Sequence, residues 1–313
     1  MKRKTKAKNI AVMLCLLVGI MSGNSLVLHA AGSAAQAPGP NAAKTITIGV
    51  DLESIQKLDV SSQDVQAAWD VLTEGVTKDY GYFVRTVLYS DFMKLNADFK
   101  IHNLDVVVTT ALNYLRMPPE VASNRDPDLY GAVFRGQKTS HYLLLVRADS
   151  GISAVGELQG KKLLLRRGDN TGRFYLDALL GRHGQAEAPR FFGAIQGSET
   201  YSQAVLAAFF KKGEACLVIQ EAFETMAELN PQVGKQLAIL DQSPAIANPV
   251  LFLQQQLPQD VKDTALKVLL NLETSVYGRQ LLMLHRIDRL TRFEPSDLDS
   301  LRALLQEYEQ RKH

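Results

Sequence analysis

Residues 139–180, TSHYLLLVRADSGISAVGELQGKKLLLRRGDNTGRFYLDALL, decide the fold of this chain. Two nearly continuous apolar runs, His141–Val146 and Lys162–Leu165, are typical of strands that helices cover on both faces of a sheet. The polar turn Gly168-Asp169-Asn170-Thr171-Gly172 follows and supplies N-cap residues for a helical pattern. The stretch therefore predicts a strand, a linker, a second strand, a turn and a helix, which is the order of elements typical of an α/β sheet.

The polar turn also predicts a binding feature. A helix that begins there directs unpaired backbone N–H groups and the positive end of its dipole at whatever lies in front of it. Its place is the carboxyl end of a strand, where an anion can be held. We therefore expect an anion-sized socket at this turn. Ordinary helix capping is the alternative interpretation, because many α/β turns have this composition.

The first 31 residues have the pattern of a bacterial secretory signal peptide. Five basic residues precede an apolar core from Ile10 to Ile20, and small residues follow. An uncleaved membrane anchor is the alternative, although the apolar run is short for a span. Residues 32–43, rich in Ala, Gly and Pro, predict a disordered leader. We expect the mature protein to be soluble and periplasmic.

Removal of the signal changes the charge balance. The whole chain has 35 Lys and Arg against 33 Asp and Glu, and without the five leading basic residues the balance is 30 against 33, or about −3. Composition then gives no support to nucleic-acid binding. Cys216 would be the one cysteine left, so no intrachain disulfide is expected. Its apolar surroundings predict a buried, inert thiol.

Strands and helices alternate along the rest of the chain. The other predicted strands are Thr45–Val50, Tyr82–Tyr89, Leu104–Val108, Arg190–Phe192, Ala215–Ile219, Gln236–Leu240 and Val250–Gln254. The other predicted helices are Ser62–Tyr80, Asp91–Lys100, Thr200–Lys211, Glu221–Leu229, Asp260–Thr274, Ser275–His285 and Ser296–Arg311. This alternation predicts mostly parallel sheets flanked by helices, with a helical C-terminal tail packed on the first lobe.

Polar residues follow four predicted strands, where a doubly wound fold presents its ligand crevice. They are Asp51 to Ser54, Thr109-Thr110 with Tyr114 beyond, Asp169 to Thr171, and Gln220-Glu221. Capping is the competing interpretation of each group. Arg166, Arg167 and Arg173 bracket the third group and would either add a charge-assisted contact or lie solvated on the surface. Tyr142 would bond a ligand or pack in the core.

Signals for catalysis and metal binding are poor. The six His residues show neither HxxxH nor HExxH spacing, and the chain has no GxSxG elbow, CxxC pair or Walker loop. The best catalytic pair that can be assembled is Glu221 or Asp169 with Tyr142. We expect no catalytic residue, no metal and no cofactor.

The order of these segments resembles the periplasmic substrate-binding proteins of phosphate/phosphite/phosphonate ABC transporters, within the type II periplasmic-binding-protein superfamily. Tyr142–Ile152 is similar to the family's Tyr-led strand and D-S-x-I linker, and Glu157–Leu163 to its L-x-G-K strand start. The resemblance spans most of residues 44–310. It continues through Gly197-Ser198-Glu199, Ser243-Pro244, Pro249–Leu253 and Leu257-Pro258.

The resemblance implies two α/β lobes joined by crossing strands, with the ligand clamped by hinge closure. Lobe 1 would comprise residues 44–147 and 249–313, and lobe 2 residues 148–248. The protein would be a monomer that captures a small anionic solute for an inner-membrane ABC permease. A ligand-sensing module for a membrane sensor kinase is the alternative, and a periplasmic enzyme on the same scaffold is a third hypothesis.

The resemblance also implies ligand contacts from both lobes. Lobe 1 and the crossing would contribute Asp51, Ser54, Thr109, Thr110, Tyr114 and Tyr142. Lobe 2 would contribute Asn170, Thr171, Gly172, Arg173, Ser198, Glu199, Gln220 and Glu221. Two departures stand out: Thr171 is the one hydroxyl left in the helix-start turn, and the family's Ser-His is Ser198-Glu199. Since a carboxylate repels a dianion, we expect an amino-substituted anion or a ligand other than a phosphonate.

Overall fold

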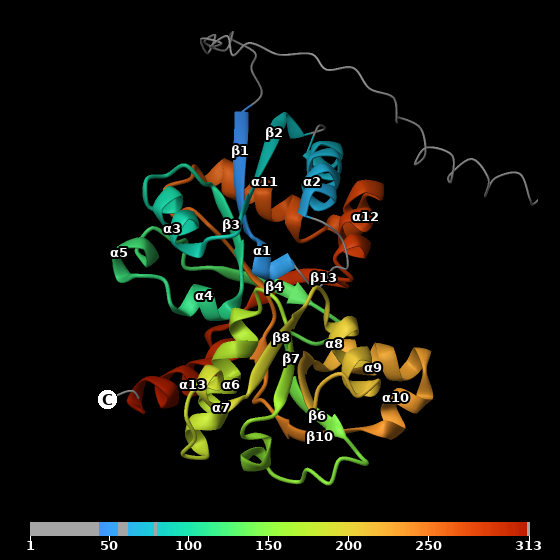
Figure 1. The fold of residues 1–313 in the computed structure, drawn as a ribbon. Helices are drawn as coiled ribbons and strands as arrows, with labels where there is room; N and C mark the ends of the chain where they lie inside the picture. Colours follow the sequence, from blue (N-terminus) through green and yellow to red (C-terminus); the bar gives the residue numbers. More distant parts are fainter. Residues whose placement is uncertain (1–43, 56–61, 78–79, 312–313) are drawn as a thin grey trace, which may run out of the picture. The chain divides into compact units, whose positions relative to one another are not determined.

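The computed structural model describes residues 44–55, 62–77 and 80–311, with side chains from Trp69 onward in the second range. The predicted signal peptide and leader lie outside these residues. Two sheets dominate the described chain, one of six strands and one of five, and a two-stranded ladder accompanies them. Figure 1 shows the elements with their labels.

The six-stranded sheet has the order β13-β4-β12-β3-β1-β2. Its strands are β1 (Lys44–Asp51), β2 (Tyr82–Tyr89), β3 (Val106–Thr109), β4 (Leu129–Val133), β12 (Val250–Leu253) and β13 (Arg289–Phe293). β1 pairs in parallel with β2 and β3, whereas β12 runs antiparallel to β3 and β4, and β13 to β4. Most strands of the sheet therefore share one direction, as predicted, and β12 and β13 run against it.

Alternating side chains give this sheet two apolar faces, because successive residues of a strand point to opposite sides. Val106 and Leu251 belong to one apolar cluster, and their neighbours Val107 and Phe252 belong to the other. The first face is covered by α2 (Ser62–Thr77), α11 (Gln259–Leu269) and α12 (Val276–Leu284). The second is covered by α3 (Phe92–Lys100), α4 (Ala111–Leu115) and α5 (Pro119–Ala122).

The five-stranded sheet has the order β10-β6-β9-β7-β8. Its strands are β6 (Tyr142–Arg147), β7 (Lys162–Arg166), β8 (Ala194–Ser198), β9 (Ala215–Ile219) and β10 (Leu237–Gln242). β6 runs antiparallel to β9 and β10, while β7 is parallel to β8 and β9. Every residue of β9 is buried, which the continuous apolar run predicted.

The helices of this second region follow its strands. They are α6 (Asn170–Arg182), α7 (Ala188–Phe191), α8 (Tyr201–Phe209), α9 (Gln220–Leu229) and α10 (Pro231–Gln236), with the 3₁₀ turn η2 (Val155–Leu158) before β7. The 3₁₀ turn η3 (Leu272–Thr274) lies between α11 and α12, and the 3₁₀ turn η4 (Pro295–Leu298) follows β13 and leads into the last helix, α13 (Asp299–Gln310).

Two chain segments cross between the sheets. They contain β5 (Thr139–Ser140) and β11 (Ile246–Ala247), which pair antiparallel. β6 follows β5 after one residue and lies in the five-stranded sheet, whereas the predicted lobe boundaries assign residues 142–147 to lobe 1. The division into lobes stays a proposal, and this pairing places the crossing at β5 and β11.

Some sequence expectations differ from the structure. The sequence predicts a strand at Arg190–Phe192, but the structure has the short helix α7 there, which begins at Ala188 with Pro189 in its first turn, and β8 starts only at Ala194. The adjacent aromatic residues Phe191 and Phe192 are typical of a buried strand. Both are buried, but their rings pack against each other within and just after α7. β4 and β13 were not predicted, and β13 interrupts the expected helical tail.

The last helix packs differently from the prediction. α11 and α12 cover the six-stranded sheet as expected, but α13 contacts α6. Arg182 of α6 donates to both carboxylate oxygens of Glu307, and Phe174 meets Tyr308 edge to face at 5.1 Å. The tail therefore packs on both regions of the described chain.

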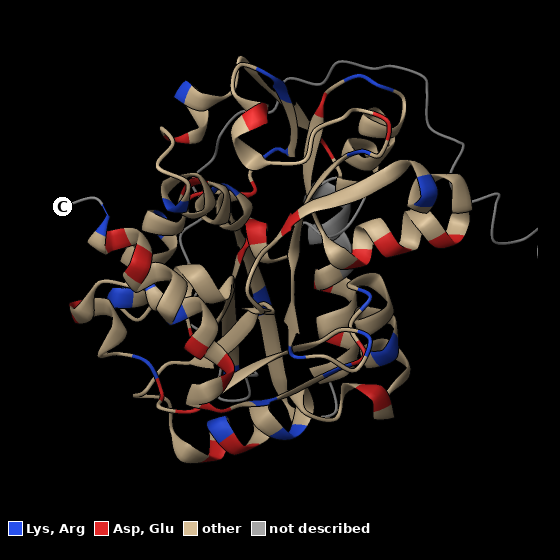
Figure 2. Ribbon diagram, turned by 90° about the horizontal axis from the view of Figure 1, so that it is seen from below, with Lys and Arg blue, Asp and Glu red and all other residues tan. Residues whose placement is uncertain are grey.

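The positions of Lys and Arg are interspersed with those of Asp and Glu along the ribbon in Figure 2. Each helix in the described ranges is too short or too polar to cross a membrane.

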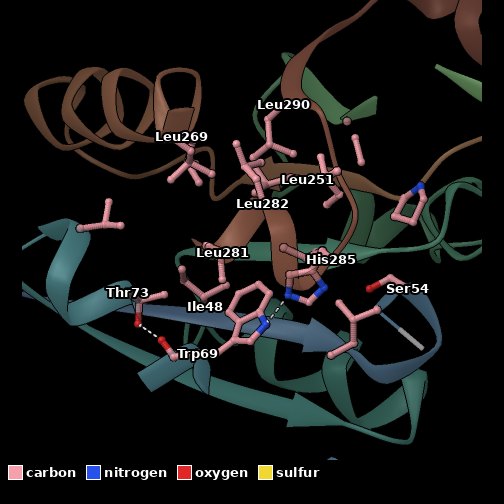
Figure 3. A pocket seen from close by; sticks show the side chains of 18 of the residues that line it. Ile48, Ser54, Trp69, Thr73, Leu251, Leu269, Leu281, Leu282, His285 and Leu290 are labelled. Carbon is pink, nitrogen blue, oxygen red and sulfur yellow. Dashed lines mark hydrogen bonds between the residues drawn. The ribbon is translucent and has the colours of Figure 1, made fainter. Parts of the chain in front are cut away.

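An apolar cavity of about 110 Å³ lies between the six-stranded sheet and the helices α2 and α12 (Figure 3). At its wall, Trp69 Nε1 donates to His285 Nε2 at 2.6 Å, with the two rings edge to face. Burial lowers the pKa of His285 to about 4, since a charged imidazole would be desolvated there. The cavity offers a hydrophilic solute almost no polar contact.

We expect His285 to make the fold sensitive to acid. The unfolded chain protonates this side chain near pH 6.5 and the folded protein only near pH 4, so His285 contributes stability above pH 6.5 that is lost as the pH falls. Between pH 7.5 and 4.5, the free energy of unfolding should fall by about 2 kcal/mol more in the protein than in His285→Gln. Urea titrations followed by the emission of Trp69, the single tryptophan, measure this difference. Parallel pH profiles would contradict it.

Candidate functional site

One cavity joins polar side chains from both sheets. Its volume is about 60 Å³, and it opens where the crossing segments meet the carboxyl ends of β1, β3, β7 and β9 and the amino end of β6. The polar residues that line it are Glu53, Ser54, Thr110, Ser140, Tyr142, Arg166, Asp169, Thr171, Tyr201 and Asn248. Apolar residues such as Ile246 and Pro249 complete the wall.

A buried carboxylate organises the start of α6. Asp169 caps the helix, with Oδ1 accepting from the backbone N–H of Gly172 and from the hydroxyl of Tyr142, both at 2.8 Å. Its Oδ2 accepts from the hydroxyl of Tyr201 at 2.9 Å. Burial, and then the charge of Asp169, raises the pKa of Tyr142 well above its usual range, so this hydroxyl remains a donor. Asp169 is therefore the group that fixes the turn, which agrees with the capping interpretation for this residue.

The predicted socket lies immediately beside this cap, and it holds a carboxylate of the protein itself. Glu53 Oε1 accepts from the backbone N–H and from the hydroxyl of Thr171, each at 2.8 Å. Glu53 Oε2 accepts from the side-chain amide of Asn170 at 2.8 Å. These are the contacts that an N-terminal helix turn makes with an anion.

The surroundings of Glu53 raise the pKa of its carboxyl group. Its pKa is raised to about 7, first by burial and then by the charges of Asp169 and Asp51, while the hydrogen bonds from Thr171 act in the opposite direction. Its backbone is fixed by a hydrogen bond from Glu53 N–H to Asp51 Oδ1 at 3.0 Å. Glu53 belongs to the short helix α1 (Leu52–Ile55), directly after β1.

The predicted residues after β1 and β3 come together, but they bond mainly to one another. Asp51 Oδ2 accepts from the hydroxyl of Thr109 and from the amide of Asn113, both at 2.8 Å. The hydroxyl of Ser54 donates to the Asp51 carbonyl, and Thr110 caps α4. Ser54 and Thr110 line the cavity, whereas Asp51 and Thr109 support Glu53 from outside the lining.

Some of the remaining predicted residues lie at the cavity, and others lie away from it. Tyr142 and Thr171 line the cavity, Asn170 bonds Glu53, and Gly172 gives its N–H to Asp169. Tyr114 packs against Phe252 and under Arg125, and Arg173 is exposed. Ser198 donates to backbone carbonyls of Leu165 and Thr200. Whether these residues contact a solute stays a prediction.

Glu199 does not bring the expected negative charge to the cavity. Glu199 is exposed and pairs with Arg167 at 2.6 Å, and neither residue lines the cavity. Glu53 brings a carboxylate to the site instead. The sequence signal for Glu53 was its place in the polar segment after β1.

Gln220 and Glu221 line a different, larger cavity of about 420 Å³ on α9. Gln220 donates to Glu224, and Glu221 accepts from the hydroxyl of Ser140. Arg135, beyond β4, pairs there with Glu224 at 3.0 Å. Among the residues whose positions are described, no cluster of His, Cys, Asp and Glu has the arrangement of a metal site.

The chain matches a protein family over residues 58–301. That family is described as the periplasmic substrate-binding protein of phosphonate ABC transporters. The chain belongs to this family. Family membership makes it a substrate-binding protein of the periplasmic type, and no protein of curated function matches the sequence.

Solved structures share the fold. A binding-protein component of an ABC phosphonate transporter from Pseudomonas aeruginosa is 14% identical, with a TM-score of 0.63 over 86% of this chain and 88% of that one. A Xanthomonas citri protein bound to ATP is 14% identical, with a TM-score of 0.63 over 86% and 98%. PhnD1 of Prochlorococcus marinus, bound to methylphosphonate, is 14% identical, with a TM-score of 0.61 over 85% and 98%. The two-lobed type II fold predicted from the sequence is confirmed.

Two glycines of α6 provide a matched test of the packed turn. A Cβ on Gly172 would lie 2.4 Å from Asp169 Oδ2 and 2.9 Å from the Tyr142 ring, so Gly172→Ala should destabilise the protein by about 1–3 kcal/mol. A Cβ on Gly181 would meet nothing closer than 3.6 Å, so Gly181→Ala should stabilise it by about 0.5–1 kcal/mol. Chemical denaturation of both variants measures the two effects. Equal changes would show that the turn is not tightly packed.

Proposed function

We propose that this chain is the solute receptor of an ABC importer and that it binds the oxyanion group of a small solute at the N-terminus of α6. One observation carries this proposal. The N–H and hydroxyl of Thr171 and the amide of Asn170 converge on a carboxylate, which is the geometry of an oxyanion seat. The work of such a protein is binding and closure, without a chemical step.

The finer features of the proposal concern export and delivery. Residues 1–31 would direct the chain to the periplasm, where it would act as a monomer. The antiparallel pair of β5 and β11 joins the two sheets and would supply the hinge for closure around the solute. An inner-membrane permease would receive the solute from the closed form.

The charge of the cavity restricts the solute. Glu53 and Asp169 line it, and Arg166 is the cationic side chain among its described lining residues. Arg166 is buried and lies over the ring of Tyr201 at 5.0 Å. When Glu53 is ionised, these side chains carry one excess negative charge, which favours a monoanion, such as a phosphonate monoanion, a sulfonate or a carboxylate, over a dianion.

Calorimetry with the exported form of the protein tests the proposal. The panel is methylphosphonate, phosphite, phosphate, ATP, methanesulfonate, sulfate and acetate. We expect saturable binding of at least one small oxyanion. A flat response of folded protein to the whole panel would contradict the proposed function.

Methanesulfonate and sulfate form a matched pair for the charge argument. At an effective dielectric constant of about 20, a second negative charge about 6 Å from the excess carboxylate costs about 3 kcal/mol. We therefore expect methanesulfonate to bind at least about tenfold more tightly than sulfate at equal ionic strength. Tighter binding of sulfate would show that the cavity presents more positive charge than these residues supply.

A further inference from the structure

We propose that Glu53 is a built-in competitor of the solute, because its carboxylate occupies the oxyanion seat of α6 in the ligand-free protein and has to leave before the solute binds. The inference rests on the proposed function, since it concerns the same seat. It goes further by assigning to one residue the control of solute affinity and of closure without solute.

The competition follows from the donors. The N–H and hydroxyl of Thr171 each have one hydrogen, and both already point at Glu53 Oε1. The side-chain amide of Asn170 donates to Glu53 Oε2. A solute oxyanion at this place would need the same donors, so the two carboxylate-like groups exclude each other.

The space beside Glu53 leads to the same conclusion. The cavity of about 60 Å³ has room for a few water molecules. A solute with its own oxyanion group therefore needs the volume that the Glu53 side chain fills. Removal of this side chain should both free the donors and enlarge the site.

The contact also joins elements of the two sheets. Glu53 belongs to α1 at the end of β1, whereas Asn170 and Thr171 begin α6 after β7. Asp51 holds the Glu53 backbone, and Thr109 and Asn113 hold Asp51. The carboxylate is thus presented to α6 in a fixed position, and its three hydrogen bonds hold α1 and α6 together in the absence of solute.

The charges around Glu53 give the contact a pH dependence. The facing groups are Asp51 from β1, Asp169 before α6, Tyr142 from β6, Arg166 from β7 and Tyr201 from α8. Burial and the two carboxylates raise the pKa of seated Glu53 to about 7 from the ordinary 4.5 of a released side chain. The seated state is therefore most favoured below pH 4.5 and loses stability as the pH rises through 7.

The test compares Glu53→Ala and Glu53→Gln with the protein and with Glu120→Gln, a control that removes an exposed carboxylate on α5. The probe is methylphosphonate. Glu53→Ala should bind it at least tenfold more tightly than the protein, and Glu53→Gln should lie between them because one carbonyl oxygen remains. The advantage of Glu53→Ala should shrink from pH 6 to pH 8, and a ratio of affinities at each pH cancels the titration of the probe. Glu120→Gln should match the protein.

A second readout needs no ligand. Spin labels at Lys94→Cys on α3 and Lys212→Cys after α8, both exposed, report the distance between the two regions by electron resonance. Without solute, the distances between the two labels should be short in the protein and longer in Glu53→Ala. Identical distributions, or equal methylphosphonate affinities with binding intact, would overturn the role of Glu53 and leave the proposed function standing. If no oxyanion binds any variant, the proposed function fails, and the ligand-free distances alone decide whether Glu53 holds the two regions together.

Discussion

The seat of a carboxylate on the first turn of α6 is the interaction on which the site depends. Thr171 and Asn170 provide three donors at 2.8 Å, and the helix dipole adds to their effect. The seat exists because Asp169 is buried behind it and holds Gly172, Tyr142 and Tyr201 in place. Without that buried cap, the turn would not present its donors in one direction.

The fold brings the other half of the site to this turn. The carboxyl ends of β1 and β3 carry Asp51, Thr109 and the helix α1, and these elements direct Glu53 towards α6. The crossing segments β5 and β11 connect the two sheets, and the contact of Glu53 with Thr171 is a further link between the same two regions. α13 adds a second connection, because its Glu307 binds Arg182 of α6. Under the proposed function, binding and closure would share one set of contacts.

Local chemistry predicted much of this arrangement. The apolar runs of β6, β7 and β9 and the cap at Asp169 follow from sequence period and turn composition, and the structure confirms these elements. The hydrogen-bond or ion-pair partner of each polar side chain could not be predicted in the same way. Glu199 and Glu53 both follow strand ends, yet Glu199 meets Arg167 at the surface while Glu53 reaches α6. That difference depends on contacts between residues 32 positions apart for Glu199 and 118 positions apart for Glu53, which period and composition do not encode. Short strands such as β13 were missed for a related reason, since pairing with β4 outweighs their weak local pattern.

A crystal structure of the protein with methylphosphonate would show which group occupies the first turn of α6. We expect a phosphonate oxygen on the N–H and hydroxyl of Thr171, with the Glu53 carboxylate moved away from α6. A bound phosphonate elsewhere in the protein, with Glu53 still on Thr171 and Asn170, would contradict this expectation.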